Sequence, residues 1–114
     1  MKNIIYKITN ILLLFLLLYS VESYSQITAI HFNAEWNKNN DVEWFDKLKE
    51  CEKKSLFIEK EGIQKKYEIA VVPTIIIFKD GDEVKRFQAD ISFTMPATRE
   101  DIQEFIDDLI MSEF

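Results

Sequence analysis

The sequence predicts one α/β domain in which helices flank a four-stranded mixed sheet, with the element order β-α-β-α-β-β-α. Three observations support this prediction. Residues 27–33 and 74–79 are apolar runs with the length and composition of buried strands. Residues 80–82, Asp-Gly-Asp, follow the second run directly and are typical of a tight hairpin turn. Residues 98–110 carry apolar side chains at helical spacing. A parallel β-α-β half followed by a hairpin and a helix accounts for this order.

The segment after the first strand predicts a helix. Residues 37–41 are polar and include residue types that cap helix N-termini, so a turn is expected there, before a helix over 42–53. Val42, Phe45 and Leu48 recur with a spacing that places them on one helix face.

The elements that follow are shorter. A strand is expected at 56–58 and a short helix at 62–68. Residues 74–79 are apolar at nearly every position, which predicts a central strand covered on both faces. Residues 83–89 alternate imperfectly, as an edge strand can.

The C-terminal part predicts a loop and an amphipathic helix. Residues 90–97 form the expected loop, with Ile91, Phe93 and Met95 as exposed apolar candidates. Thr98 and Asp101 give a capping-box signal in which Asp replaces the usual Glu or Gln. The apolar stripe of this helix consists of Ile102, Phe105, Ile106, Leu109 and Ile110.

The N-terminal segment predicts a secretory signal peptide over residues 1–25. Residues 1–7 carry two lysines and no acid, residues 11–19 carry no charge, and serines follow at 20, 23 and 25. The mature domain is then expected over 26–114, outside the cytoplasm, in the periplasm or secreted. An uncleaved membrane anchor is the alternative, although the uncharged run is shorter than the roughly 20 residues that span a bilayer.

The composition excludes several function classes. The chain has 14 basic and 20 acidic residues, and this acidity disfavours nucleic acid and anionic membrane surfaces as partners. The single histidine, His31, has no cluster of Cys or carboxylates in the sequence around it, so neither a metal site nor a cofactor is expected. The single cysteine, Cys51, is expected to be either buried and inert or paired between chains.

Two stretches resemble the thioredoxin family. Residues 32–40, FNAEWNKNN, are similar to the family's F-x-A-x-W-C-x-x-C motif, with Asn37 and Asn40 at the two cysteine positions. Residues 72–81, VPTIIIFKDG, are similar to the family's Pro-Thr, apolar strand and K-[ND]-G hairpin. The resemblance covers nearly all of the mature chain except the family's additional N-terminal strand and helix. It implies the fold but not the chemistry, because an amide has no thiolate to attack a disulfide.

The resemblance also implies roles for individual residues. The Val72-Pro73 bond is expected to be cis and to face a groove, where the Val72 backbone could pair with an extended peptide. The alternative is that the cis bond only completes the fold. Trp36 is expected either to contact a partner beside this groove or to pack on the first helix. Asn37 and Asn40 are expected to cap the first helix.

Other positions depart from the family pattern. His31 stands where active thioredoxins hold a buried acid, and we expect it to be buried with a lowered pKa. Phe45 replaces the family's helix proline, and residues 89–91 lack the family's loop glycine. The apolar loop 91–96 either presents a partner surface or folds back over the sheet.

The leading hypothesis is a secreted, redox-inactive domain without enzymatic activity. It would bind a polypeptide partner through a groove formed by Trp36, Asn37, Asn40, Val72 and Pro73. One alternative is a thiol-disulfide oxidoreductase in cell redox homeostasis that uses Cys51, although this residue cannot occupy the redox position. The other is a structural secreted protein that makes no use of the groove. The sequence leaves the oligomeric state open.

Overall fold

A computed structural model describes residues 26–113 of the chain, so the predicted signal peptide lies outside the described residues. The elements are β1 (Ile27–Asn33), the 3₁₀ segments η1 (Glu35–Asn40) and η2 (Phe45–Lys47), β2 (Glu52–Phe57), α2 (Ile63–Lys66), β3 (Thr74–Lys79), β4 (Asp82–Gln88) and α3 (Arg99–Met111). Within this part of the chain, no helix is both long and apolar enough to cross a membrane.

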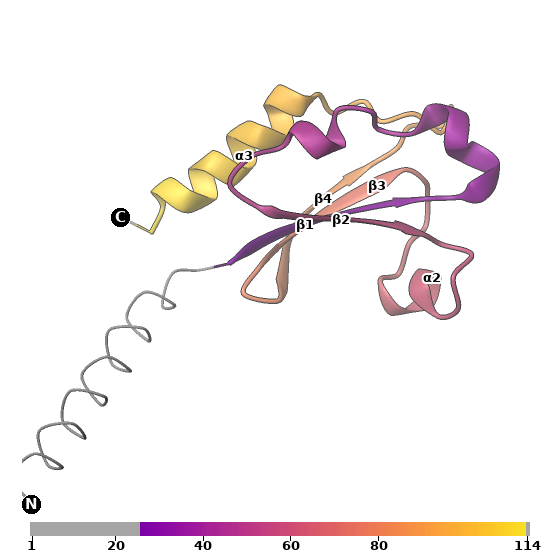
Figure 1. Cartoon of the computed structure of the whole chain (residues 1–114), viewed down its shortest axis with the longest axis horizontal. Helices are drawn as coiled ribbons and strands as arrows, with labels where there is room; N and C mark the ends of the chain where they lie inside the picture. Colours follow the sequence, from indigo (N-terminus) through magenta and orange to yellow (C-terminus); the bar gives the residue numbers. More distant parts are fainter. Residues whose placement is uncertain (1–25, 114) are drawn as a thin grey trace, which may run out of the picture.

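The sheet has the strand order β2-β1-β3-β4 (Figure 1). β1 runs parallel to β2 and antiparallel to β3, and β3 pairs antiparallel with β4. The predicted four-stranded mixed sheet is therefore confirmed. β1 and β3 occupy the middle of the sheet, which explains why most side chains of both strands are buried on both faces.

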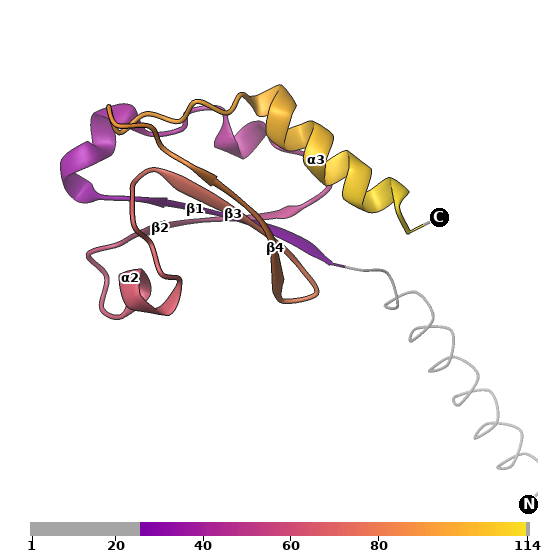
Figure 2. The same ribbon diagram turned by 180° about the vertical axis from the view of Figure 1, so that it is seen from behind.

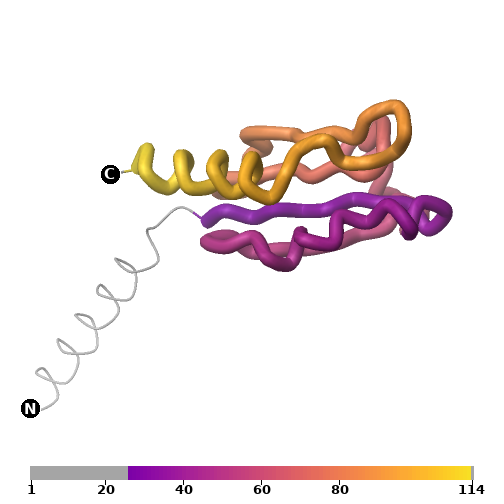
Figure 3. The backbone as a smooth tube through the Cα atoms, turned by 90° about the horizontal axis from the view of Figure 1, so that it is seen from above, coloured from indigo at the N-terminus to yellow at the C-terminus, as the bar shows by residue number. Residues whose placement is uncertain are grey.

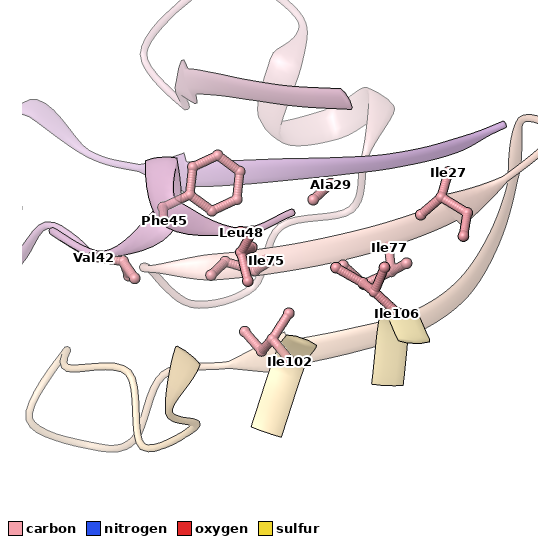
Figure 4. Close-up of a cluster of buried hydrophobic side chains, with 9 residues drawn as sticks. All are labelled: Ile27, Ala29, Val42, Phe45, Leu48, Ile75, Ile77, Ile102 and Ile106. Carbon is pink, nitrogen blue, oxygen red and sulfur yellow. The ribbon is translucent and has the colours of Figure 1, made fainter. Parts of the chain in front are cut away.

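Helices and turns cover both faces of the sheet. Figures 1 and 2 show α3 and the η1–η2 segment over one face and α2 over the other. Seen from above, α3 lies beside the η1–η2 segment (Figure 3). Side chains alternate along β3, so Ile75 and Ile77 face the α3 side and Ile76 faces the α2 side. Figure 4 shows the core on the α3 side, formed by Ile27, Ala29, Val42, Phe45, Leu48, Ile75, Ile77, Ile102 and Ile106.

The predicted helix over 42–53 is wrong. This stretch contains only the three-residue η2, and the backbone becomes extended at Leu48, with φ −63° and ψ 139°. Glu50 follows with φ 63°, a left-handed conformation that a right-handed helix cannot contain. β2 then begins at Glu52, which pairs with Thr28 of β1. Parallel pairing with β1 thus takes residues that the pattern assigned to a helix.

The apolar side chains of the predicted helix are buried nevertheless. Val42, Phe45 and Leu48 all belong to the core on the α3 side. Their spacing of three residues fits the 3₁₀ repeat as well as an α-helix, so the periodicity identifies the buried face but not the helix type. Cys51 consequently lies immediately before β2 and not along a helix.

β2 is longer than predicted. A strand was expected only at 56–58, whereas β2 covers Glu52–Phe57 with the sequence EKKSLF. β2 is an edge strand of the sheet, and most of its side chains are exposed. Charged side chains, lysine above all, protect an edge strand from pairing with other chains, and they also conceal the strand from pattern analysis.

The hairpin and the last helix follow the prediction. Gly81 has φ 88° at the turn between β3 and β4, and β4 is the other edge strand. At the start of α3, Asp101 donates its N–H to Thr98 Oγ1 over 3.1 Å, and Thr98 donates its N–H to Asp101 Oδ2 over 2.8 Å. The aspartate therefore completes the capping box. α2 occupies only Ile63–Lys66 of the predicted short helix.

Candidate functional site

The two asparagines at the family's cysteine positions form an amide network. Asn37 is 5 % exposed in the middle of η1 and donates from Nδ2 to Asn33 Oδ1 over 3.0 Å. Asn40 donates from Nδ2 to Asn37 Oδ1 over 2.9 Å. The expectation that these residues cap a helix is wrong, since the N-cap position of η1 is Ala34 and no side chain caps it. Asn37 and Asn40 lie inside η1, and their side-chain amides are paired with Asn33, Phe93 and Asn37 and not with the first backbone amides of a helix.

Asn33 is the residue of this network that the sequence analysis missed. It is the last residue of β1, is 1 % exposed, and donates from Nδ2 to the carbonyl of Asn37 over 3.1 Å and to Asp41 Oδ1. A buried amide must find partners, because an unpaired polar group in an apolar interior is costly. The only local signal was an asparagine within a strand that was predicted to be buried.

The loop between β4 and α3 is joined to this network through Phe93. Asn37 Nδ2 donates to the carbonyl oxygen of Phe93 over 3.1 Å. The Phe93 ring meets the Trp36 ring edge to face, with centroids 5.2 Å apart and an interplanar angle of 89°. Figures 1 and 3 accordingly show the loop next to η1 at one end of the sheet.

The loop itself is organised by Asp90. Asp90 Oδ1 accepts from the N–H of Ser92 over 3.0 Å and from its hydroxyl over 2.5 Å. These hydrogen bonds hold the pKa of Asp90 below its usual value. Phe93 then adopts φ 61°, a left-handed conformation that is uncommon for an aromatic residue. This turn directs the Phe93 carbonyl and ring toward η1.

A groove of about 310 Å³ lies beside the aromatic pair. It is lined by Trp36, Ile58, Gln64, residues 69–72 and Phe93. Trp36 and Val72 of the predicted groove thus line it, whereas Asn37, Asn40 and Pro73 do not. Asn37 and Asn40 instead support the aromatic pair from behind, through the hydrogen bond from Asn37 to Phe93.

The Val72-Pro73 peptide bond is cis. Val72 is only 3 % exposed, although it lines the groove. Within residues 26–113, neither the N–H nor the carbonyl of Val72 takes part in a hydrogen bond, because the pairing of β3 with β1 stops at Thr74. The backbone of Val72 therefore has an unused hydrogen-bond donor and acceptor, and both have little access to solvent.

The apolar loop has an exposed part and a buried part. Ile91 is 99 % exposed and Phe93 is 44 % exposed, and the Phe93 ring contacts Trp36. Met95 instead packs against the core on the α3 side.

His31 is buried, as expected. Its ring lies 5.3 Å from the Phe45 ring between centroids, and Nδ1 lies 3.4 Å from Ser55 Oγ. Nε2 is buried without a hydrogen-bond partner. Burial lowers the pKa of His31 below 6.5, and the opposing effect of the Asp41 and Asp46 carboxylates is weaker. His31 belongs to the interior beneath η2 and does not line the groove.

Cys51 also lies away from the groove. It packs, half-buried, against the core on the α3 side, and burial raises the pKa of its thiol. Among residues 26–113, no three His, Cys, Asp or Glu side chains come close enough together to hold a metal ion.

Known structures with a similar arrangement include thioredoxins. The chain aligns with Fasciola hepatica thioredoxin at a TM-score of 0.55 and 23 % identity, over 73 % of this chain and 80 % of the other. It aligns with thioredoxin-2, a component of malaria parasite protein secretion machinery, at a TM-score of 0.60 and 17 % identity, over 74 % and 84 % of the two chains. The chain has a thioredoxin-like fold. With Cys51 as its single cysteine, this thioredoxin-like domain lacks both cysteines of the C-x-x-C motif.

Similarity to known proteins is weaker in sequence than in structure. No protein-family model matches the thioredoxin-like chain. It is 33 % identical to glutaredoxin 3 of Danio rerio over 69 residues. The alignment spans 53 % of this chain but only 21 % of that protein.

Proposed function

We propose that this thioredoxin-like domain acts outside the cytoplasm as a redox-inactive binding module, and that an extended polypeptide segment occupies the groove beside Trp36 and Val72. The groove carries this proposal. It places an indole that is 64 % exposed beside a backbone segment with an unused donor and acceptor. Exposed aromatic side chains beside a hollow are typical contact residues, and free backbone groups can pair with an added strand.

The charges next to the groove favour an uncharged, apolar segment as the ligand. In η1, Glu35 and Lys38 lie on either side of Trp36 and pair with each other at 2.7 Å. The groove lining itself contains no charged residue, and Gln64 is its most polar side chain. A charged peptide side chain in this groove would lose hydration without gaining a partner.

Two features support redox inactivity. The asparagines at the motif positions cannot form a thiolate, and the single thiol lies outside the groove with a raised pKa. The extracytoplasmic location depends on the signal-peptide pattern of residues 1–25 alone.

Titration by NMR with unstructured synthetic peptides tests this function. Peptides with a central Phe or Leu should shift the amide signals of Ala70, Val71 and Val72, and the Trp36→Ala variant should bind them several-fold more weakly. Val84→Ala is the matched control, because Val84 is an exposed apolar residue of β4 that does not line the groove. Shifts confined to residues outside the groove, or none at all, would contradict the proposal.

A further inference from the structure

Phe93 lies at the mouth of the proposed binding groove and is held there from outside its own loop. Two contacts hold it: the hydrogen bond from Asn37 Nδ2 to its carbonyl at 3.1 Å, and the ring contact with Trp36. Both partners belong to η1, whereas Phe93 belongs to the loop between β4 and α3. Two segments that are far apart in the sequence therefore contact each other where they line the groove.

The contact between Phe93 and η1 affects how a peptide strand could reach Val72. A peptide that pairs with the Val72 backbone needs access to its N–H and carbonyl, yet Val72 is 3 % exposed. Trp36 and Phe93 line the same groove as Val72. The Val72 side chain packs in the core on the α2 side, so only its backbone is available to the groove, and a peptide that enters the groove to reach this backbone meets the Trp36 and Phe93 rings.

The loop has the features of a segment that can move as a unit. Phe93 holds a left-handed backbone with φ 61°, and its ring is still 44 % exposed although it contacts Trp36. Ile91 in the same loop is almost fully exposed. The ends are anchored separately, by the hydrogen bond from Ala89 N–H to the Pro73 carbonyl at 3.0 Å and by Met95 in the core. The attachments at both ends of residues 90–94 therefore do not depend on η1.

We propose that residues 90–94 form an autoinhibitory strap, which the hydrogen bond from Asn37 holds against the Trp36 ring and which a polypeptide ligand must displace in order to contact Trp36. This inference rests on the proposed function, because it concerns the regulation of the same groove. Asn37 has a specific part: the amide at the first motif position is the latch of the strap. A ligand that binds only the open state has an apparent affinity reduced by the fraction of molecules that are open.

The test measures the affinity of two pairs of variants of the full chain for one peptide, the one that the wild-type protein binds most tightly. Asn37→Ala removes the latch, and Asn39→Ala is its control because Asn39 is an exposed asparagine of η1 that takes no part in the hydrogen bonds of Asn37 with Phe93 and Asn40. Phe93→Gly removes the ring at a left-handed position that glycine adopts freely. Ile91→Ala is its control, because it removes an exposed apolar side chain that does not line the groove and adds no glycine to the loop. Circular dichroism establishes that each variant is folded.

The strap predicts that Asn37→Ala and Phe93→Gly bind the peptide more tightly than wild type, by about tenfold if about one molecule in ten is open. The controls should stay within about twofold of wild type. The fluorine signal of fluorotryptophan at Trp36 should also move in Phe93→Gly, and peptide should move the wild-type signal in the same direction. If both variants bind equally well or more weakly than wild type, Phe93 is only a wall of the groove and the strap is overturned. If no peptide binds wild type or any variant, the proposed function itself fails, and the strap with it.

Discussion

Asn40 donates a hydrogen bond from Nδ2 to Oδ1 of Asn37 over 2.9 Å. The side chains at the two motif positions therefore point toward each other, although η1 is a kinked 3₁₀ segment and not the first turn of an α-helix. A neutral amide pair here keeps the convergence that a cysteine pair would need, without any redox chemistry.

This convergence predicts that a disulfide can be introduced. In a Cys51→Ser background, Asn37→Cys combined with Asn40→Cys should form an internal disulfide under mild oxidation, because converging side chains suit the short Cβ separation of a disulfide. Mass spectrometry of the folded protein measures the loss of two hydrogens. Free thiols after oxidation would show that the geometry of η1 differs from the one described.

The engineered disulfide should be reduced slowly, and the engineered protein should catalyse disulfide reduction only slowly. Asn37 is 5 % exposed, so a thiol at this position is shielded, and burial disfavours its thiolate. We expect slow insulin reduction that becomes faster when Phe93→Gly is added. Equal rates with and without Phe93→Gly would contradict shielding by the loop.

The native chain should have no disulfide reductase activity. Its single thiol, Cys51, lies outside the groove, and burial raises its pKa. Insulin reduction by the protein should equal the buffer blank, and Cys51→Ser should change nothing. Turnover that persists in Cys51→Ser would refute this prediction.

Asn33 should be important for stability. Asn33→Ala removes two donated hydrogen bonds and the acceptor for Asn37, and leaves buried polar groups unpaired. We expect a loss of about 2 kcal/mol in the free energy of unfolding, measured with urea. Asn39→Ala, at an exposed neighbouring position, should change it by no more than about 0.5 kcal/mol. Similar values for the two variants would contradict the network.

His31 should make the fold sensitive to mild acid. Its folded pKa lies below the ordinary 6.5, so the unfolded chain binds a proton more readily. The contribution of His31 to stability is then fully present above pH 6.5 and decreases as the pH falls toward the folded pKa, by up to about 1.4 kcal/mol per pH unit. Urea unfolding between neutral and acidic pH measures this slope, which should be reduced in His31→Phe. An NMR titration that places the pKa of His31 at or above 6.5 would disprove the assignment.

The sequence by itself determined the elements whose signals are local. The apolar runs of β1 and β3 define buried strands, Asp80-Gly81 defines the hairpin, and Thr98 with Asp101 defines the start of α3. Each of these signals arises from neighbouring residues: period and composition for the strands, turn chemistry for the hairpin, and a side chain that pairs with backbone three residues away for the helix.

Only the tertiary structure decided the rest. β2 is a strand because β1 offers it a parallel partner, which overrides the helical spacing of the residues before it. The hydrogen bond from Asn37 to Phe93 joins residues 56 positions apart, and no local pattern encodes such a contact. Non-local pairing and burial determine where an amide side chain finds its partners. For this reason the sequence could place Asn37 at the motif position, while its contact with the loop became apparent only in the folded chain.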